Sequence, residues 1–228
     1  MIDAYHLLLF AHVVAFAYWL GGDLGVFFCA KRVANPDLAL DERLRWLDCA
    51  LTVDMAPRSA LILILAIGFH LAVMQAWLPL DAVWVGLGWA LAAIWLALGW
   101  IAFAREGQPI AHTARRFDRP IRLAMMGLAM MGLVLAAGVS SLAYGWPLAT
   151  PWLAAKLVLF GLIIVVGLML RGVVDYWLRG FALLRAGNTA DGEALIHRGH
   201  MLGERWAYAI WALVALAAFL GVTKWWPW

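Results

Sequence analysis

The chain of 228 residues is 66% hydrophobic and only 14% charged, contains 15 Trp and carries a formal net charge of +3. Soluble domains average about 45–50% apolar and about 25% charged residues, so this composition excludes an ordinary soluble protein and a disordered chain. A membrane-spanning helix uses about 20 apolar residues. The length therefore predicts an all-α, polytopic membrane protein: a single domain of six transmembrane helices.

Long uncharged runs are expected to form the six spans in chain order. They cover about 5–28, 56–77, 82–103, 123–144, 152–170 and 206–223. The longest stretch between spans, 171–205, is rich in Arg and Leu and is expected to form an amphipathic cytoplasmic helix. A break is expected in it at Gly187 and Asn188, because these residue types favour turns.

The distribution of basic residues predicts the orientation. All of the 17 Lys and Arg except Lys156 and Lys224 fall around the first, third and fifth connections between spans. Cytoplasmic loops are enriched in these residues, so both termini are expected outside, in a multi-pass protein of the bacterial inner membrane. The basic loops predict contact with anionic membrane lipids and no nucleic-acid partner. Cys29 and Cys49 then fall on the reducing cytoplasmic side, where free thiols are expected.

Polar and ionisable groups are expensive within a span, so each is a functional candidate. His12 lies seven residues after Tyr5, and His70 lies seven residues before Trp77. At a rise of about 1.5 Å per residue, both imidazoles are expected roughly 10 Å below the outer surface. The two histidines are therefore predicted to lie level on adjacent antiparallel helices.

The spacing within the first span predicts which side chains face the interior. His12, Phe16, Trp19 and Asp23 are four, three and four residues apart and form one stripe. His6 lies on another face near the helix end and is expected at the membrane interface.

Two level imidazoles inside a helical bundle are a typical way to hold a haem iron. His12 and His70 are accordingly candidate axial ligands, and small neighbours such as Gly68 leave room for a flat ring. The chain has no C-x-x-C-H motif, so the haem is expected to be non-covalent, of b type. The alternative remains open that each histidine simply hydrogen-bonds to a neighbouring helix.

Lys156 lies about four residues inside the fifth expected span, on the outer side. A lysine there either snorkels to the interface or pairs with an anionic group such as a haem propionate.

Charged groups also gather toward the cytoplasmic side. Asp54 and Arg58 are four residues apart on one helix face, which suits an ion pair, and Asp23 is expected nearby. This cluster is interpreted as a structural anchor, or alternatively as a proton relay or a quinone contact. A second stripe, formed by Glu193, His197, His200 and Glu204, offers either a metal-ligand set or a solvated helix face.

Several segments resemble those of HemJ-type protoporphyrinogen oxidases and the related CopD-like membrane proteins. In the first span, His12 is followed by Trp19 and the pair Gly21–Gly22, and the fifth span opens with Trp152-Leu-Ala-Ala-Lys156-Leu. The segments Glu42-Arg43-Leu and Met55-Ala56-Pro57 are also similar to the HemJ pattern before its second helix. The resemblance implies a bound b-type haem and functional roles for His12 and Lys156.

The resulting expectation is a haem b-containing membrane redox protein, with the haem near the outer leaflet between the first and second spans. It either transfers electrons or oxidises a small reductant as a HemJ-like membrane oxidoreductase. His12, His70, Lys156 and Trp19 are the expected cofactor-binding residues. A quinone or porphyrin-type molecule, a second copy of the chain or another membrane subunit are the candidate partners. A CopD-like copper or small-solute transporter and a structural subunit of a membrane complex are the alternatives.

Overall fold

The computed structural model describes residues 2–78, 80–110, 113–114, 116–117, 120–121, 123–124 and 151–224. The ordered elements in these ranges are all helices: α1 (Ala4–Val33), α2 (Leu40–Val53), α3 (Met55–Met74), α4 (Ala82–Ala104), α6 (Pro151–Arg185) and α7 (Thr189–Thr223).

Five helical segments in the described part of the chain are long and apolar enough to cross a membrane. They are α1, α2 together with α3, α4, α6 and α7, and they contain the expected spans 5–28, 82–103, 152–170 and 206–223 and nearly all of 56–77. The all-helical architecture is therefore confirmed, and the five segments are compatible with a multi-pass membrane protein. The expected span at 123–144 lies outside the described residues, except for 123–124.

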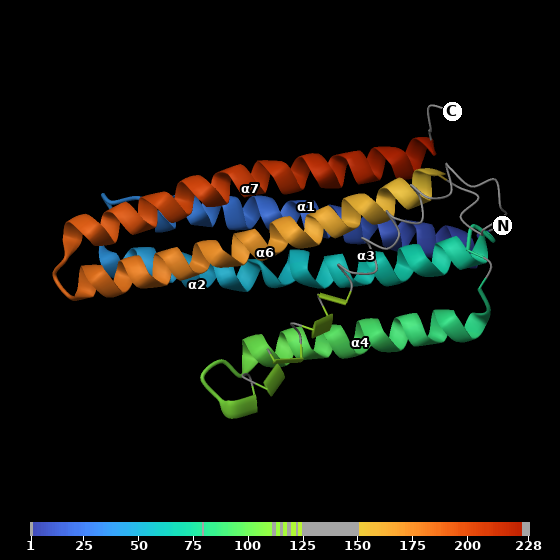
Figure 1. The fold of residues 1–228 in the computed structure, drawn as a ribbon, viewed down its shortest axis with the longest axis horizontal. Helices are drawn as coiled ribbons and strands as arrows, with labels where there is room; N and C mark the ends of the chain where they lie inside the picture. The colour runs from blue at the N-terminus through green and yellow to red at the C-terminus, as the bar shows by residue number, and fades with distance from the viewer. Residues whose placement is uncertain are drawn as a thin grey trace.

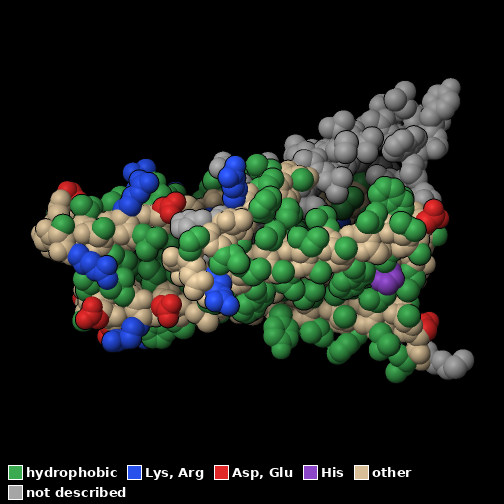
Figure 2. Space-filling model, turned by 90° about the horizontal axis from the view of Figure 1, so that it is seen from below, with side chains coloured by type: hydrophobic (Ala, Val, Ile, Leu, Met, Phe, Trp, Pro, Cys, Tyr) green, Lys and Arg blue, Asp and Glu red, His purple; other side chains and the backbone are tan. Residues whose placement is uncertain are grey.

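The helices pack side by side in a long bundle (Figure 1). α1 contacts α2, α3 and α7, while α6 pairs with α7 along its length and α4 packs against α3. The N-terminus and the end of α7 lie at the same end of the bundle, and the turn between α6 and α7 lies at the other (Figure 1). Lys and Arg side chains appear in the half that contains this turn, and hydrophobic side chains dominate the other half (Figure 2).

The α6–α7 hairpin extends beyond what a bilayer can enclose. Each helix has 35 residues, which corresponds to about 52 Å, whereas the hydrocarbon core measures about 30 Å. The expected break is confirmed, since Gly187 has a φ of +83° and the Asn188 side chain caps α7. The stretch 171–205 is helical on both sides of this break, as expected, and its two parts continue α6 and α7 without interruption.

The part of the α6–α7 hairpin that includes residues 171–205, the extension, has its own apolar core. This core explains why both helices continue past the expected ends of the spans. Val173, Trp177 and Phe181 recur at four-residue spacing on α6 and stay buried. They pack against Val33, Leu47 and Ile196 from three other helices. The hydrophobic stripe of α6 thus passes from the membrane into the extension, and the helix continues with it.

The second span is likewise longer than expected, since α2 and α3 together run from Leu40 to Met74 with one interruption at Asp54. Pro57 lies in the first turn of α3 and has no N–H to donate to the Val53 carbonyl. The helix therefore breaks one turn before the proline. This places Pro57 against α1, where a Cβ at Gly22 would lie 2.5 Å from its Cδ.

Candidate functional site

The predicted interior stripe of α1 faces the bundle core. Trp19 is 4% exposed and belongs to a buried cluster against which Phe16 packs. Asp23 lines an internal cavity one turn further along the helix. The other members of the buried cluster are Ala60, Ile163, Val166, Ile210 and Val214. The four- and three-residue spacing therefore identified the inward face of α1 correctly.

His12 lies toward the N-terminal end of the same stripe and packs against α3. A Cβ built at Gly68 would lie 3.0 Å from the His12 Cε1, so the imidazole occupies the space that a side chain at this position would fill. The His12 Nδ1 is buried and has no hydrogen-bond partner among the described residues. A buried polar atom of this kind is costly unless another group engages it.

His70 lies at a similar depth, two residues beyond Gly68, but it faces a different helix. The Trp89 indole N–H of α4 donates to the His70 Nδ1 at 3.4 Å. Two residues correspond to about 200° around an α-helix, so Gly68 and His70 lie on nearly opposite faces of α3. The structure therefore does not bring the imidazoles of His12 and His70 together, although they are nearly level.

Lys156 reaches from α6 across to α7. Its Nζ would lie 2.7 Å from a Cβ built at Gly221, so the glycine makes room for the ammonium group. Lys156 is also close enough to His12 for an electrostatic interaction. No ion pair found in the described ranges includes Lys156. The structure thus brings Lys156 and His12 into one region of the bundle, in the half that contains the start of α1.

His6 lies at the exposed start of α1, as expected for an interfacial residue. Its Nδ1 lies 2.7 Å from the Asp3 Oδ1, and its backbone N–H donates to the same oxygen. The His6 backbone and ring hold the pKa of the exposed Asp3 carboxyl below its usual range. His6 is therefore part of the helix cap and is distinct from the buried site around His12.

Trp89 and Gly221 were missed by reasoning from the sequence. Both act through neighbours on other helices, Trp89 through His70 and Gly221 through Lys156. Their residue types are common in apolar helices, so no local pattern distinguishes them before the helices are packed.

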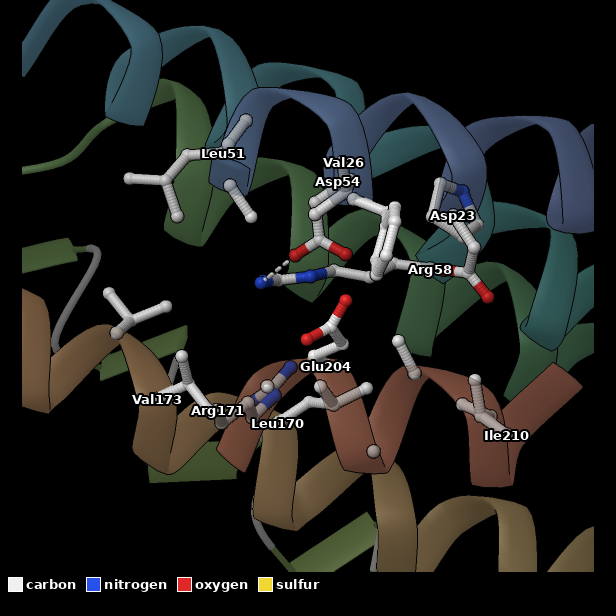
Figure 3. A pocket seen from close by; sticks show the side chains of 18 of the residues that line it. Asp23, Val26, Leu51, Asp54, Arg58, Leu170, Arg171, Val173, Glu204 and Ile210 are labelled. Atoms are coloured by element: carbon white, nitrogen blue, oxygen red, sulfur yellow. Dashed lines mark ion pairs between the residues drawn. The ribbon is translucent and has the colours of Figure 1, made fainter. Parts of the chain in front are cut away.

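The charge cluster expected near the cytoplasmic side is partly formed. Arg58 and Asp54 make the predicted ion pair, and the Glu204 carboxylate of α7 faces Arg58 across the interior (Figure 3). Asp23 takes part in no ion pair found among the described residues.

The stripe of Glu193, His197, His200 and Glu204 does not form a metal site. Glu193 binds Arg43, with Nη1 to Oε1 at 2.6 Å. Glu204 accepts a hydrogen bond from the Tyr208 hydroxyl at 3.2 Å. Across the described ranges no group of three or more His, Cys, Asp and Glu is arranged to hold a metal ion. The metal alternative for this stripe is not supported, because Glu193 binds Arg43 and Glu204 binds Tyr208 at separate positions along α7.

These geometries define one candidate cofactor region around His12 and Lys156, in the half of the bundle that contains the start of α1, and one polar interior region in the half that contains the α6–α7 turn. Comparison of the chain with protein-family models, with curated proteins and with solved structures found no match.

Proposed function

We propose that this chain binds haem b non-covalently and acts as a membrane redox protein, with His12 as the axial ligand. The observation that carries the proposal is the buried His12 imidazole, whose Nδ1 has no hydrogen-bond partner in the described part of the chain. Neutral imidazole is the commonest protein ligand for metals, and a proximal histidine is a standard haem ligand.

The surroundings of His12 support the same assignment. Gly68 backs the imidazole, Trp19 lies buried two turns below it, and Lys156 supplies a cation in the same region. A cation without a carboxylate partner among the described residues suits an anionic ligand such as a propionate. Haem would supply one-electron redox chemistry, while the protein residues bind it and exclude water.

The orientation of His70 favours a single protein ligand over a bis-imidazole pair. Because His70 faces Trp89, ligation by both histidines would require α3 to rotate or His70 to change partners. A single imidazole ligand leaves an iron position open, which suits HemJ-like oxidation of a small reductant better than electron transfer alone.

The topology that we propose places the α6–α7 turn in the cytoplasm and both termini outside, in a bacterial inner membrane. The gathering of Lys and Arg in the half of the molecule that contains the turn supports this orientation.

The test is the visible spectrum of detergent-purified protein after expression with a haem supply. We expect a Soret band and a reduced-minus-oxidised α band in the wild type, loss of both in His12→Ala, and retention in His6→Ala and His70→Ala. Loss of both bands in His12→Ala and also in His70→Ala would instead support ligation by both histidines. Absence of the bands in folded, haem-supplied wild type would overturn the proposal and leave transport or a structural role.

A further inference from the structure

A cavity of about 160 Å³ lies between α1, α2, α3, α6 and α7, in the half of the bundle that contains the α6–α7 turn (Figure 3). Its wall is largely aromatic and aliphatic, with Trp19 at one end and Trp177 toward the other. Ionisable groups interrupt this apolar wall: Asp23, Asp54, Arg58, Arg171, His200 and Glu204.

Three buried polar atoms among the residues that line this cavity lack hydrogen-bond partners in the described part of the chain. They are the Asp23 Oδ2, the Trp177 Nε1 and the Trp211 Nε1. Native proteins pair nearly all such atoms, so each one calls for an explanation such as a bound ligand or water. All three belong to residues around one cavity, so an occupant with its own donors or acceptors could engage them after small rotations of these side chains.

The chemistry of the three atoms restricts the occupant. Both indole N–H groups are donors only, so the occupant must carry acceptors, while the Asp23 carboxyl accepts a hydrogen bond or, when protonated, donates one. The Asp54–Arg58 ion pair already satisfies the charges of those two residues. A strongly anionic occupant is disfavoured because Asp23 and Glu204 also line the space.

The size of the cavity restricts the occupant further. An engineered protein cavity of about 150 Å³ admits one benzene ring, and the cavity here has about 160 Å³. The volume is therefore sufficient for one six-membered ring, and the apolar walls suit its faces. The location inside a membrane bundle favours a ring that arrives from the lipid phase.

We infer that this cavity binds the ring of a membrane quinone, with the Trp211 indole N–H donating to a ring carbonyl and the Asp23 carboxyl at a ring oxygen. Reduction of the ring adds two electrons and two protons and converts its two carbonyls into hydroxyls. The two electrons would come from the small reductant of the proposed function, and the two protons from water. This redox role rests on the proposed function, whereas the binding of the quinone does not.

The position of the cavity suits electron transfer between its occupant and the His12 region. Trp19 lines the cavity on the same face of α1 as His12. Seven residues separate them, which corresponds to about 10 Å along the helix.

Two glycines of α6 provide a matched pair of variants. Gly167 lines the cavity and Gly172 does not; a Cβ at either position would meet no atom within 4 Å. Gly167→Leu should place its side chain in the cavity, whereas Gly172→Leu adds the same side chain elsewhere on the helix. A second pair tests the hydrogen bond: Trp211→Phe removes an unpaired cavity N–H, and Trp100→Phe removes an N–H that is bound to Ser59 on another part of the surface.

The assay titrates detergent-purified protein with a decyl-substituted benzoquinone and follows the quenching of tryptophan fluorescence. We expect saturable quenching in the wild type, in Gly172→Leu and in Trp100→Phe. The dissociation constant should rise at least tenfold in Gly167→Leu and several-fold in Trp211→Phe. If Gly167→Leu does not fold, the tryptophan pair decides the result.

Equal dissociation constants in Gly167→Leu and wild type, or in Trp211→Phe and Trp100→Phe, would overturn the assignment. Unsaturable quenching in folded wild type would also overturn it and indicate that the cavity holds water only. The titration is run with and without haem supplied during expression. Saturable quinone binding without a haem spectrum would refute the proposed function alone, while a haem spectrum without quinone binding would refute this inference alone.

Discussion

Arg43 of α2 and Glu193 of α7 form a bidentate ion pair that links these two helices. The Arg43 Nη1 and Nη2 donate to the Glu193 carboxylate at 2.6 and 3.1 Å, and Nε donates to the Val33 carbonyl at 2.8 Å. The Arg43 side chain is 2% exposed and that of Glu193 is 31% exposed. The guanidinium therefore depends on its protein partners, whereas the carboxylate borders solvent.

This asymmetry predicts unequal effects of the two single truncations. Glu193→Ala leaves a buried guanidinium unpaired, and we expect it to lower the free energy of unfolding by about 3 kcal/mol. Arg43→Ala leaves an unpaired carboxylate that water can reach. The loss of the ion pair in this variant should therefore lower the free energy of unfolding by less than in Glu193→Ala. The measurement is denaturation in detergent, followed by circular dichroism.

The double variant Arg43→Met/Glu193→Leu is the control for the ion pair. Replacing both charges with apolar side chains should cost less than Glu193→Ala alone, because no buried charge remains. A double variant less stable than Glu193→Ala would contradict this account.

The adjacent glycines Gly21 and Gly22 predict opposite outcomes for the same substitution. A Cβ at Gly22 would lie 2.5 Å from the rigid Pro57 ring, whereas one at Gly21 would meet nothing within 4 Å. Gly22→Ala should force α1 away from α3 and destabilise the protein by about 1–3 kcal/mol. Gly21→Ala should be neutral or stabilising by up to about 1 kcal/mol, since alanine favours helix. Thermal unfolding of both variants in one detergent checks this, and equal melting temperatures would refute the contact.

Gly68→Ala tests the placement of the His12 imidazole. The new methyl group would lie 3.0 Å from the His12 Cε1, so the ring must move. If His12 holds haem, the Soret band should shift or the haem content should fall. Gly86→Ala on α4 is the matched control, since a Cβ there meets nothing within 4 Å. An unchanged spectrum in Gly68→Ala would argue against His12 as ligand.

Cys29 and Cys49 provide a chemical test of the α1–α2 packing. Their Sγ atoms lie 3.7 Å apart, and both cysteines are free thiols. A disulfide bond is about 2.05 Å long, so a modest movement allows it to form. An aromatic disulfide reagent should accept the two electrons, release two thiol products and link the two cysteines. Mass spectrometry should then show the loss of two hydrogens.

Cys49→Ser is the control for this reaction. It should give no internal link, and the buried Cys29 should react slowly or not at all. Wild type that carries one reagent group on Cys49 and no internal bond would show that the thiols are further apart.

Much of the candidate site could be predicted from residue order, but its assembly could not. The spacing of Phe16, Trp19 and Asp23 identified the buried face of α1, and the four-residue spacing of Asp54 and Arg58 identified an ion pair. Both inferences concern a single helix, whose geometry is regular.

Inferences across helices were less reliable. His12 and His70 were placed level by counting residues, but their faces depend on how far each helix is rotated about its axis. The close contact of Gly22 with Pro57 and the pairing of His70 with Trp89 reflect that rotation.

The amino-acid sequence by itself determined the helical architecture and the position of five segments that are long and apolar enough to span a membrane, because these follow from long apolar runs along the chain. Only the tertiary structure decided that α6 and α7 each continue as one helix up to their shared turn, that His12 meets Gly68 rather than His70, and that three unpaired polar atoms belong to residues around one cavity. Helix rotation and close packing set these relationships, and both depend on contacts between residues far apart in the chain.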